Sequence, residues 1–300
     1  MTGAGRGLGL AYARALSRAG AAVMINDIDP ELTAQAVNLI ESEGGLADSQ
    51  GGPVGATSTA DSLVQSTVDR FGRLDVMVTN AGVLRDRVLW KMSDEDFDEV
   101  VNVHLRGTFT CARSAAVHFR EAGHGGRLIL VGSPAGQRGN FGQSNYAACK
   151  AGITGMARTW AMELARFDVT VNCIIPTAVT EMTKTIPAFA PFIEAWERGE
   201  QPLPDWLRRD HAMGSVDDVA PLVVFLASDK SGGITGQTIA LGGDRLALWS
   251  YPEEAAVAFS DGGWDAGSIG EEFRSRFEKM PQPYGITLPQ APLTGEEVIG

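Results

Sequence analysis

Short apolar runs alternate along this chain with longer segments in which apolar residues recur every three or four positions. The short runs are typical of strands buried on both faces of a parallel sheet, and the longer segments are typical of amphipathic helices. This order predicts an α/β fold with a doubly wound, mostly parallel sheet. We expect strands at residues 21–25, 74–79, 127–131, 169–175 and 238–241, and helices at residues 10–16, 30–43, 62–71, 93–102, 107–121, 146–167 and 215–227.

Three segments depart from this pattern. Residues 44–59 are rich in glycine and are expected to form a loop. Residues 177–214 are irregular and contain several aromatic side chains, which suits either a lid over a substrate or an ordinary surface loop. Residues 244–300 are too poor in apolar residues to form a core of their own. We therefore expect one folded domain over residues 1–243, followed by an extension that is not an independent domain.

Composition and charge exclude several classes of function. The chain is 44% hydrophobic and 21% charged, which is ordinary for a globular protein. A formal net charge of -12 argues against nucleic acid or an anionic membrane as the main partner. No apolar run approaches the ~20 residues of a membrane span. The 3 cysteines and 4 histidines show no ligand spacing, so we expect no metal site and a reduced, cytoplasmic protein.

A glycine-rich turn opens the chain and leads directly into the first predicted helix. Its spacing, Gly3-x-x-x-Gly7-x-Gly9, differs from the commoner G-x-G-x-x-G pattern. Glycines let the backbone approach a pyrophosphate, and the following helix N-terminus offers free N–H groups. Asp27 follows the next apolar run, about 20 residues later, where a carboxylate is placed to bind a ribose hydroxyl. Asp27 could also simply open the turn before Pro30. Taken together, the glycine-rich turn and Asp27 predict a dinucleotide site.

Tyr146 and Lys150 lie one helical turn apart and therefore share a helix face. A free phenol has a pKa near ~10, and a nearby cation favours the phenolate and lowers that pKa. Such a pair can act as a general acid and base. Ser133 follows the apolar run that ends at Val131, where its hydroxyl could hydrogen-bond a substrate oxygen. A tyrosine and a lysine at this spacing are also common on ordinary helix surfaces.

Taken together over residues 2–243, these features resemble the short-chain dehydrogenase/reductase family. The matching elements are Thr2-Gly3-x-x-x-Gly7-x-Gly9, Asn80-Ala81-Gly82, Asn102, Ser133, Tyr146-x-x-x-Lys150 and Pro176. Within that family, three further stretches are similar to the 3-hydroxyacyl-CoA dehydrogenase domain of peroxisomal multifunctional enzyme type 2 and its bacterial relatives. These stretches are Leu84-Arg-Asp-Arg87, His104-Leu-Arg-Gly107 and Gly139-Asn-Phe-Gly-Gln143.

The resemblance implies an NAD(P)-dependent oxidoreductase that interconverts a secondary alcohol and a ketone, which could be a 3-hydroxyacyl thioester. A steroid, polyol or aromatic alcohol remains an alternative substrate, and a non-catalytic dinucleotide-binding scaffold is an alternative function. A homodimer or homotetramer is also implied. The implied catalytic residues are Asn102, Ser133, Tyr146 and Lys150, with Tyr146 as general acid/base. The implied cofactor-binding residues are Gly3, Arg6, Gly7, Leu8, Gly9, Asp27, Asn80, Ala81, Gly82, Tyr146, Lys150, Pro176 and Val179.

Cofactor choice depends on two residues that favour different cofactors. Arg6 could pair with the 2′-phosphate of NADP, whereas Asp27 would repel that phosphate and accept a hydrogen bond from the 2′-hydroxyl of NAD. Because Arg6 can swing into solvent, we expect the repulsion to decide and NAD to be preferred.

Two departures from the family pattern concern the start of the sheet and the adenine side. The family has a strand before the glycine turn, but only Met1 precedes Thr2, so we expect the sheet to lack a central strand and suspect a misplaced or trimmed start. The family also usually has an Asp after the third strand, near the adenine. Nothing acidic lies between Asp48 and Asp61 here, so either Thr57 or Ser58 substitutes or the contact is lost.

Overall fold

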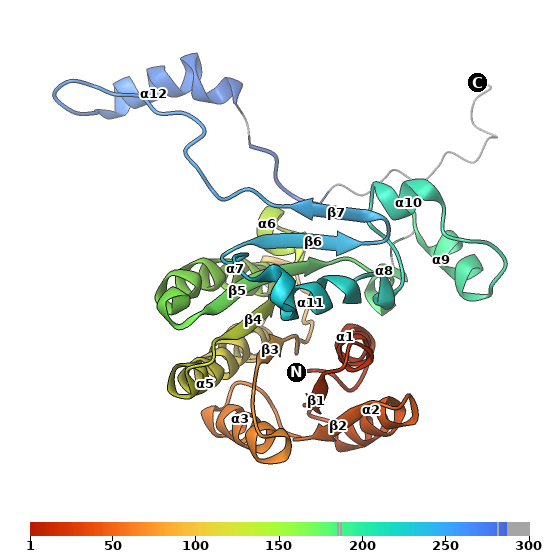
Figure 1. Cartoon of the computed structure of the whole chain (residues 1–300). Helices are drawn as coiled ribbons and strands as arrows, with labels where there is room; N and C mark the ends of the chain where they lie inside the picture. Colours follow the sequence, from red (N-terminus) through yellow and green to blue (C-terminus); the bar gives the residue numbers. More distant parts are fainter. Residues whose placement is uncertain (185, 187, 281, 287–300) are drawn as a thin grey trace.

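A mostly parallel sheet runs through the centre of the molecule, with helices on both of its faces (Figure 1). The computed structural model describes residues 1–184, 186, 188–280 and 282–286. The strands are β1 (Ala22–Ile25), β2 (Leu46–Ser49), β3 (Val76–Thr79), β4 (Gly126–Val131), β5 (Val169–Pro176), β6 (Thr238–Gly242) and β7 (Arg245–Leu248). All neighbouring strands pair in parallel except β6 and β7, which are antiparallel. The doubly wound fold expected from the sequence is confirmed.

Helices cover both faces of the sheet and also form outlying parts of the fold. They are α1 (Gly7–Arg18), α2 (Pro30–Ser42), α3 (Thr57–Phe71), α4 (Asp94–Val100), α5 (Gly107–Ala122), α6 (Pro134–Arg138), α7 (Ser144–Leu164), α8 (Glu181–Lys184), α9 (Ala190–Glu197), α10 (Asp205–Arg209), α11 (Ala220–Ala227) and α12 (Ala266–Ser275). A π-helical turn, Val101–Arg106, joins α4 to α5.

Side chains of each strand alternate between the two layers, because successive strand residues point to opposite faces. In β4, Ile129 packs in the layer of α1, α2 and α11, whereas Leu128 and Leu130 pack in the layer of α3, α5 and α7. All three are almost fully buried. This two-sided burial explains why the strands read as continuous apolar runs in the sequence.

The sheet is divided between β1 and β3. Strands β1 and β2 pair with each other, and β3 to β7 form a second, continuous sheet beside them. Met1 and Thr2 lie in the gap, where the N–H of Thr2 donates to Val78 O at 3.1 Å and the N–H of Asn26 donates to Met1 O at 2.9 Å. The expectation of a missing central strand is therefore confirmed for the part of the chain that the structure describes.

Three stretches of the chain differ from the sequence-based expectations. The loop expected at residues 44–59 contains β2, which shows no apolar run because only Ala47 of its four residues is buried. The sheet does not end with β6, since β7 adds one more strand from residues expected in the extension. Residues 177–214 are not irregular throughout: α8, α9 and α10 lie there, around a small apolar core that includes Phe189, Ile193 and Leu207.

Beyond β7 the chain leaves the body, forms α12 well away from the sheet, and then returns (Figure 1). The return is marked by Gly285, whose N–H donates to Arg138 O at 2.6 Å. Residues 287–300 of the extension lie outside the described residues. In the described ranges, no helix is both long enough and apolar enough to cross a membrane.

Candidate active site

A cavity of about 1790 Å³ opens at the carboxyl ends of the parallel strands. In open α/β sheets this is the edge where ligands bind. Its walls come from the glycine-rich turn, the segments that follow β1, β3, β4 and β5, and the helical segment between β5 and α11. The cavity exceeds the ~300–1,000 Å³ typical of one small-molecule site, so it has room for two ligands.

The glycine-rich turn forms a close-packed cradle at one end of this cavity. A Cβ atom on Gly9 would lie 2.1 Å from Gly3 O, and one on Gly3 would lie 2.6 Å from the Cα of Ala81. Gly3 also has a φ of +59°, a backbone conformation that favours glycine. Asn80 fastens the turn to the end of β3, because its Nδ2 donates to Gly3 O at 2.8 Å. Only residues without a side chain fit here, as a pyrophosphate-binding turn requires.

Asp27 lies beside the same turn, directly after β1. Its Oδ2 accepts a hydrogen bond from the Gly5 N–H at 3.1 Å, and its Oδ1 accepts one from the Asp29 N–H at 3.3 Å. These bonds hold the carboxylate at the cavity wall, next to the cradle. The arrangement fits the ribose end of a dinucleotide whose pyrophosphate lies on the glycine-rich turn.

Ser133, Tyr146 and Lys150 meet at the other end of the cavity. Ser133 is the N-cap residue of α6, and its Oγ accepts a hydrogen bond from Ala135 N–H at 3.2 Å. Lys150 lies one turn after Tyr146 on α7, with its Nζ 5.5 Å from the centre of the Tyr146 ring. The Nζ donates to Val131 O, at the end of β4, at 2.6 Å. Strand β4 and helix α7 thus bring together residues that are distant in the sequence.

Burial controls the proton affinities of this group. It lowers the pKa of Lys150 to about 8, and burial is also the largest effect on Tyr146, whose pKa is raised. A hydrogen bond from Ser133 acts in the opposite direction on Tyr146, while the charges of Asp86 and Cys149 raise its pKa further. The sequence-based expectation that Lys150 would lower the pKa of Tyr146 is therefore not met in this structure. The reason is that desolvation of the phenol, which the sequence does not reveal, is the larger effect.

Asn102 and His104 both lie on the π-helical turn between α4 and α5 and both line the cavity. Asn102 faces the segment after β2, where a Cβ on Gly55 would lie 2.8 Å from its Oδ1. His104 is buried, and its ring meets the Tyr146 ring edge-on at 5.1 Å. Burial and the charge of Lys150 lower the pKa of His104 to about 3, so its ring is neutral. From the sequence, His104 was noted only as part of the stretch His104-Leu-Arg-Gly107, and no role at the site was expected for it.

Most residues expected at the site do line the cavity, including all four expected catalytic residues. The exceptions are Gly7, which starts α1, and Val179, which packs in the small core of the α8–α10 segment. Thr57 and Ser58 also lie outside the lining, and Gly52, Pro53 and Val54 form that part of the wall instead. Among the described residues, no cluster of His, Cys, Asp and Glu is arranged to hold a metal ion.

The chain is similar in sequence to known proteins. A family model described as enoyl-(acyl carrier protein) reductase matches residues 3–243. The chain is 37% identical to hydroxyacyl-CoA dehydrogenase ChsB1 of Mycobacterium tuberculosis, covering 92% of this chain and 87% of that protein. It is 40% identical to peroxisomal multifunctional enzyme type 2 of Mus musculus, covering 62% of this chain but 26% of that longer protein.

A solved structure shares the same architecture. The crystal structure of a short chain dehydrogenase from Mycobacterium avium superimposes with a TM-score of 0.81 at 33% identity. The superposition covers 96% of this chain and 97% of that one.

Proposed function

This chain belongs to the short-chain dehydrogenase/reductase family, and on that basis we propose that it interconverts a secondary alcohol and a ketone, with Tyr146 as the general acid/base. As a family member it is an oxidoreductase that uses a nicotinamide dinucleotide. The observation that carries the proposal is the meeting of Ser133, Tyr146 and Lys150 in the cavity that also contains the glycine cradle. A scaffold that only binds a dinucleotide would not need this group.

The bound nicotinamide would supply or accept the hydride. Ser133 would orient the substrate oxygen, and the Tyr146 hydroxyl would donate a proton to that oxygen in reduction and accept it back in oxidation. The raised pKa of Tyr146 keeps the phenol protonated, which suits the reductive direction. Lys150 would supply positive charge beside the phenol. Its Nζ lies 5.5 Å from the centre of the Tyr146 ring.

The preferred cofactor would be NAD. Asp27 is held at the cavity wall by two backbone N–H groups, so it cannot turn away from a 2′-phosphate without losing both bonds. Its carboxylate would repel that dianion and would accept a hydrogen bond from a free 2′-hydroxyl. Arg6 also lines the cavity, yet it is exposed and can point into solvent when no phosphate is present.

The substrate would be a 3-hydroxyacyl thioester or its 3-keto form. The hydroxyacyl-CoA activity for which the Mycobacterium tuberculosis relative is named supports this class. The cavity itself supports it through Arg85, Arg138 and Arg245, cationic side chains suited to the phosphates of a coenzyme A carrier. Trp249, whose ring centre lies 5.4 Å from the Arg138 guanidinium, adds an aromatic surface to the same wall.

The test is turnover of 3-hydroxyacyl-CoA substrates, steroids, polyols and aromatic alcohols, followed by cofactor absorbance with NAD and with NADP. We expect the thioesters with NAD to give the highest kcat/KM. Tyr146→Phe should lower kcat by ~10²–10⁴-fold, as expected when a general acid/base is removed. Cofactor affinity should change little. Residual activity above a tenth of wild type would reject Tyr146 as the acid/base, and no turnover of any substrate would favour a scaffold.

A further inference from the structure

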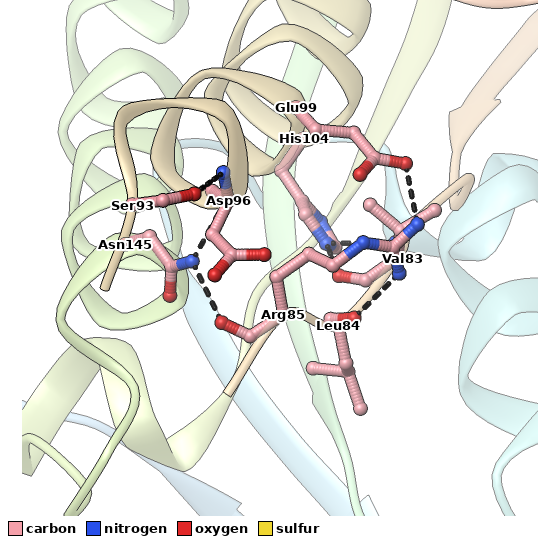
Figure 2. Close-up of polar contacts among 8 residues, drawn as sticks. All are labelled: Val83, Leu84, Arg85, Ser93, Asp96, Glu99, His104 and Asn145. Carbon is pink, nitrogen blue, oxygen red and sulfur yellow. Dashed lines mark hydrogen bonds and ion pairs between the residues drawn. The ribbon is translucent and has the colours of Figure 1, made fainter. Parts of the chain in front are cut away.

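The segment that follows β3 lines the same cavity as the proposed catalytic residues and is attached to α4, to the π-helical turn and to the start of α7 (Figure 2). Residues Asn80 to Gly82 lie beside the glycine cradle, and Val83 to Asp86 continue along the cavity wall toward the start of α7. Backbone and side-chain contacts then join this segment to α4, the π-helical turn and α7. Two buried polar residues, Asn145 and His104, make the central contacts.

Asn145 is fully buried at the start of α7, immediately before Tyr146. Its Nδ2 donates to Arg85 O and to Asp96 O, both at 3.1 Å. Its Oδ1 accepts a hydrogen bond from the backbone N–H of Tyr146 at 2.8 Å. Both amide protons and the carbonyl oxygen of this one side chain are therefore used, and they connect the cavity wall, α4 and the backbone of Tyr146. Figure 2 shows the two bonds that Asn145 donates to the cavity wall and to α4.

His104 attaches the same segment two residues earlier. Its Nε2 lies 2.8 Å from Val83 O and 3.1 Å from Val83 N. The shorter distance favours the tautomer in which Nε2–H donates to the carbonyl. The His104 ring also packs closely against Gly82, because a Cβ on Gly82 would lie 2.4 Å from the His104 Cε1. The same ring meets Tyr146 edge-on, so it contacts both the wall and the phenol.

Outside this buried pair, an exposed ion pair and a second amide hold the segment. Arg85 Nη2 lies 2.7 Å from Glu99 Oε1 on α4, as Figure 2 shows. Gln143 Nε2, just before α7, donates to Asp86 Oδ2 at 2.8 Å. The exposed ion pair is screened by solvent and is weaker than the buried contacts.

We propose that Asn145 and His104 are positioning residues, which hold the Val83–Arg85 segment against α7 and thereby set the place of the Tyr146 phenol relative to Lys150 and the substrate. The inference rests on the proposed role of Tyr146. Neither side chain needs to touch the substrate. Each acts through Tyr146: Asn145 through its backbone N–H and His104 through its ring.

This arrangement predicts a specific kind of defect. A displacement of ~1 Å from the productive geometry can cost ~10²-fold in rate. Loss of the Asn145 contacts should therefore lower kcat while cofactor binding, which depends on the glycine cradle, stays intact. Moving the phenol away from Ser133 would weaken the hydrogen bond that lowers the pKa of Tyr146, so the pH limb of alcohol oxidation should move to higher pH.

The experiment compares Asn145→Ala with Asn172→Ala as a matched control. Asn172 is another buried asparagine with both ends bonded, its Nδ2 donating to Ile234 O at 2.7 Å and its Oδ1 accepting from Gln237 N–H at 3.0 Å. It lies on β5, outside the cavity lining. Both variants should lose thermal stability. Only Asn145→Ala should lose ~10- to 100-fold in kcat and show the alkaline shift, with an unchanged Kd for NAD.

A second pair of variants tests the same idea without changing α7. His104→Leu removes the bond to Val83, whereas His104→Gln places an amide near the Nε2 position and should restore much of the kcat lost in His104→Leu. The two His104 variants also test the positioning role if Asn145→Ala does not fold. Folded Asn145 and His104 variants with the kcat and pH limb of Asn172→Ala would overturn the proposal. Full activity of Tyr146→Phe, measured alongside, would instead overturn the proposed function.

Discussion

Substituting Gly9 with alanine tests whether the glycine-rich turn is a dinucleotide cradle. The added Cβ would lie 2.1 Å from Gly3 O, 2.6 Å from Asn80 Nδ2 and 2.9 Å from the Cα of Ala4. Two of these three contacts are with backbone, which cannot rotate away as a side chain does. The Gly3 carbonyl must therefore move, and it is the acceptor of the 2.8 Å bond from Asn80 that fastens the turn to β3.

The expected magnitude follows from these contacts. Overpacking by one methyl group costs ~1–3 kcal/mol, and the strained hydrogen bond contributes ~0.5–1.5 kcal/mol. The sum is about 1.5–4.5 kcal/mol. If the turn relieves the strain by leaving its binding geometry, this free energy appears as weaker cofactor binding, roughly 10-fold or more in Kd. If the turn stays in place, the same free energy appears as lower stability of the fold.

Isothermal titration with NAD and thermal unfolding together measure both consequences. Gly155→Ala is the matched control, because Gly155 lies inside α7 and a Cβ there meets no atom within 4 Å. An alanine in a helix interior stabilises by roughly 0.5–1 kcal/mol relative to glycine. We therefore expect a slightly higher unfolding temperature and unchanged NAD affinity for the control. A Gly9→Ala protein with wild-type affinity and wild-type unfolding temperature would refute the cradle.

Three further predictions concern cofactor choice, pH dependence and assembly. Asp27→Asn should reduce the preference for NAD over NADP, measured as the ratio of kcat/KM values, and a wild-type preference for NADP of tenfold or more would contradict the role of Asp27. The pKa of buried Lys150 is lowered from 10.5 to about 8, so between these values the unfolded chain binds more protons and stability rises with pH. Lys150→Met should remove that rise, and parallel unfolding curves of the two proteins from pH 8 to 10 would argue against it. Light scattering should give a dimer or tetramer mass, since Phe109 and Met162 on the long helices α5 and α7 are exposed apolar side chains, and a monomer mass would exclude association through them.

Much of the fold is determined by the sequence because its elements carry strong local signals. The strands β3, β4 and β5 are buried on both faces, so most of their residues are apolar. The helix expected at residues 93–102 also starts where expected, because Ser93 caps α4 and its Oγ accepts the Asp96 N–H at 3.1 Å. Edge strands lack this signal. In β2 and β7 most residues remain exposed, and their pairing depends on a neighbour rather than on their own pattern.

At the site, the sequence was sufficient for the groups whose spacing is itself the signal. Tyr146 and Lys150 are four residues apart, so they share a face once that segment is helical. The glycines of the first turn indicate a close approach of the backbone to a neighbouring group. Only the tertiary structure decided which distant groups surround them. The contacts of Asn145 join residues 49 and 60 positions away in the chain, and no local pattern encodes such a pairing.

The direction of the Tyr146 pKa was decided in the same way. Sequence spacing reveals the cation at Lys150, but burial of the phenol, which depends on the tertiary structure, is the largest effect on the pKa of Tyr146 and raises it. A charge effect between neighbours on one helix can be read from a sequence. Burial is a property of the whole fold, and for this protein burial is the largest effect on the pKa of Tyr146, the residue that we propose as the general acid/base.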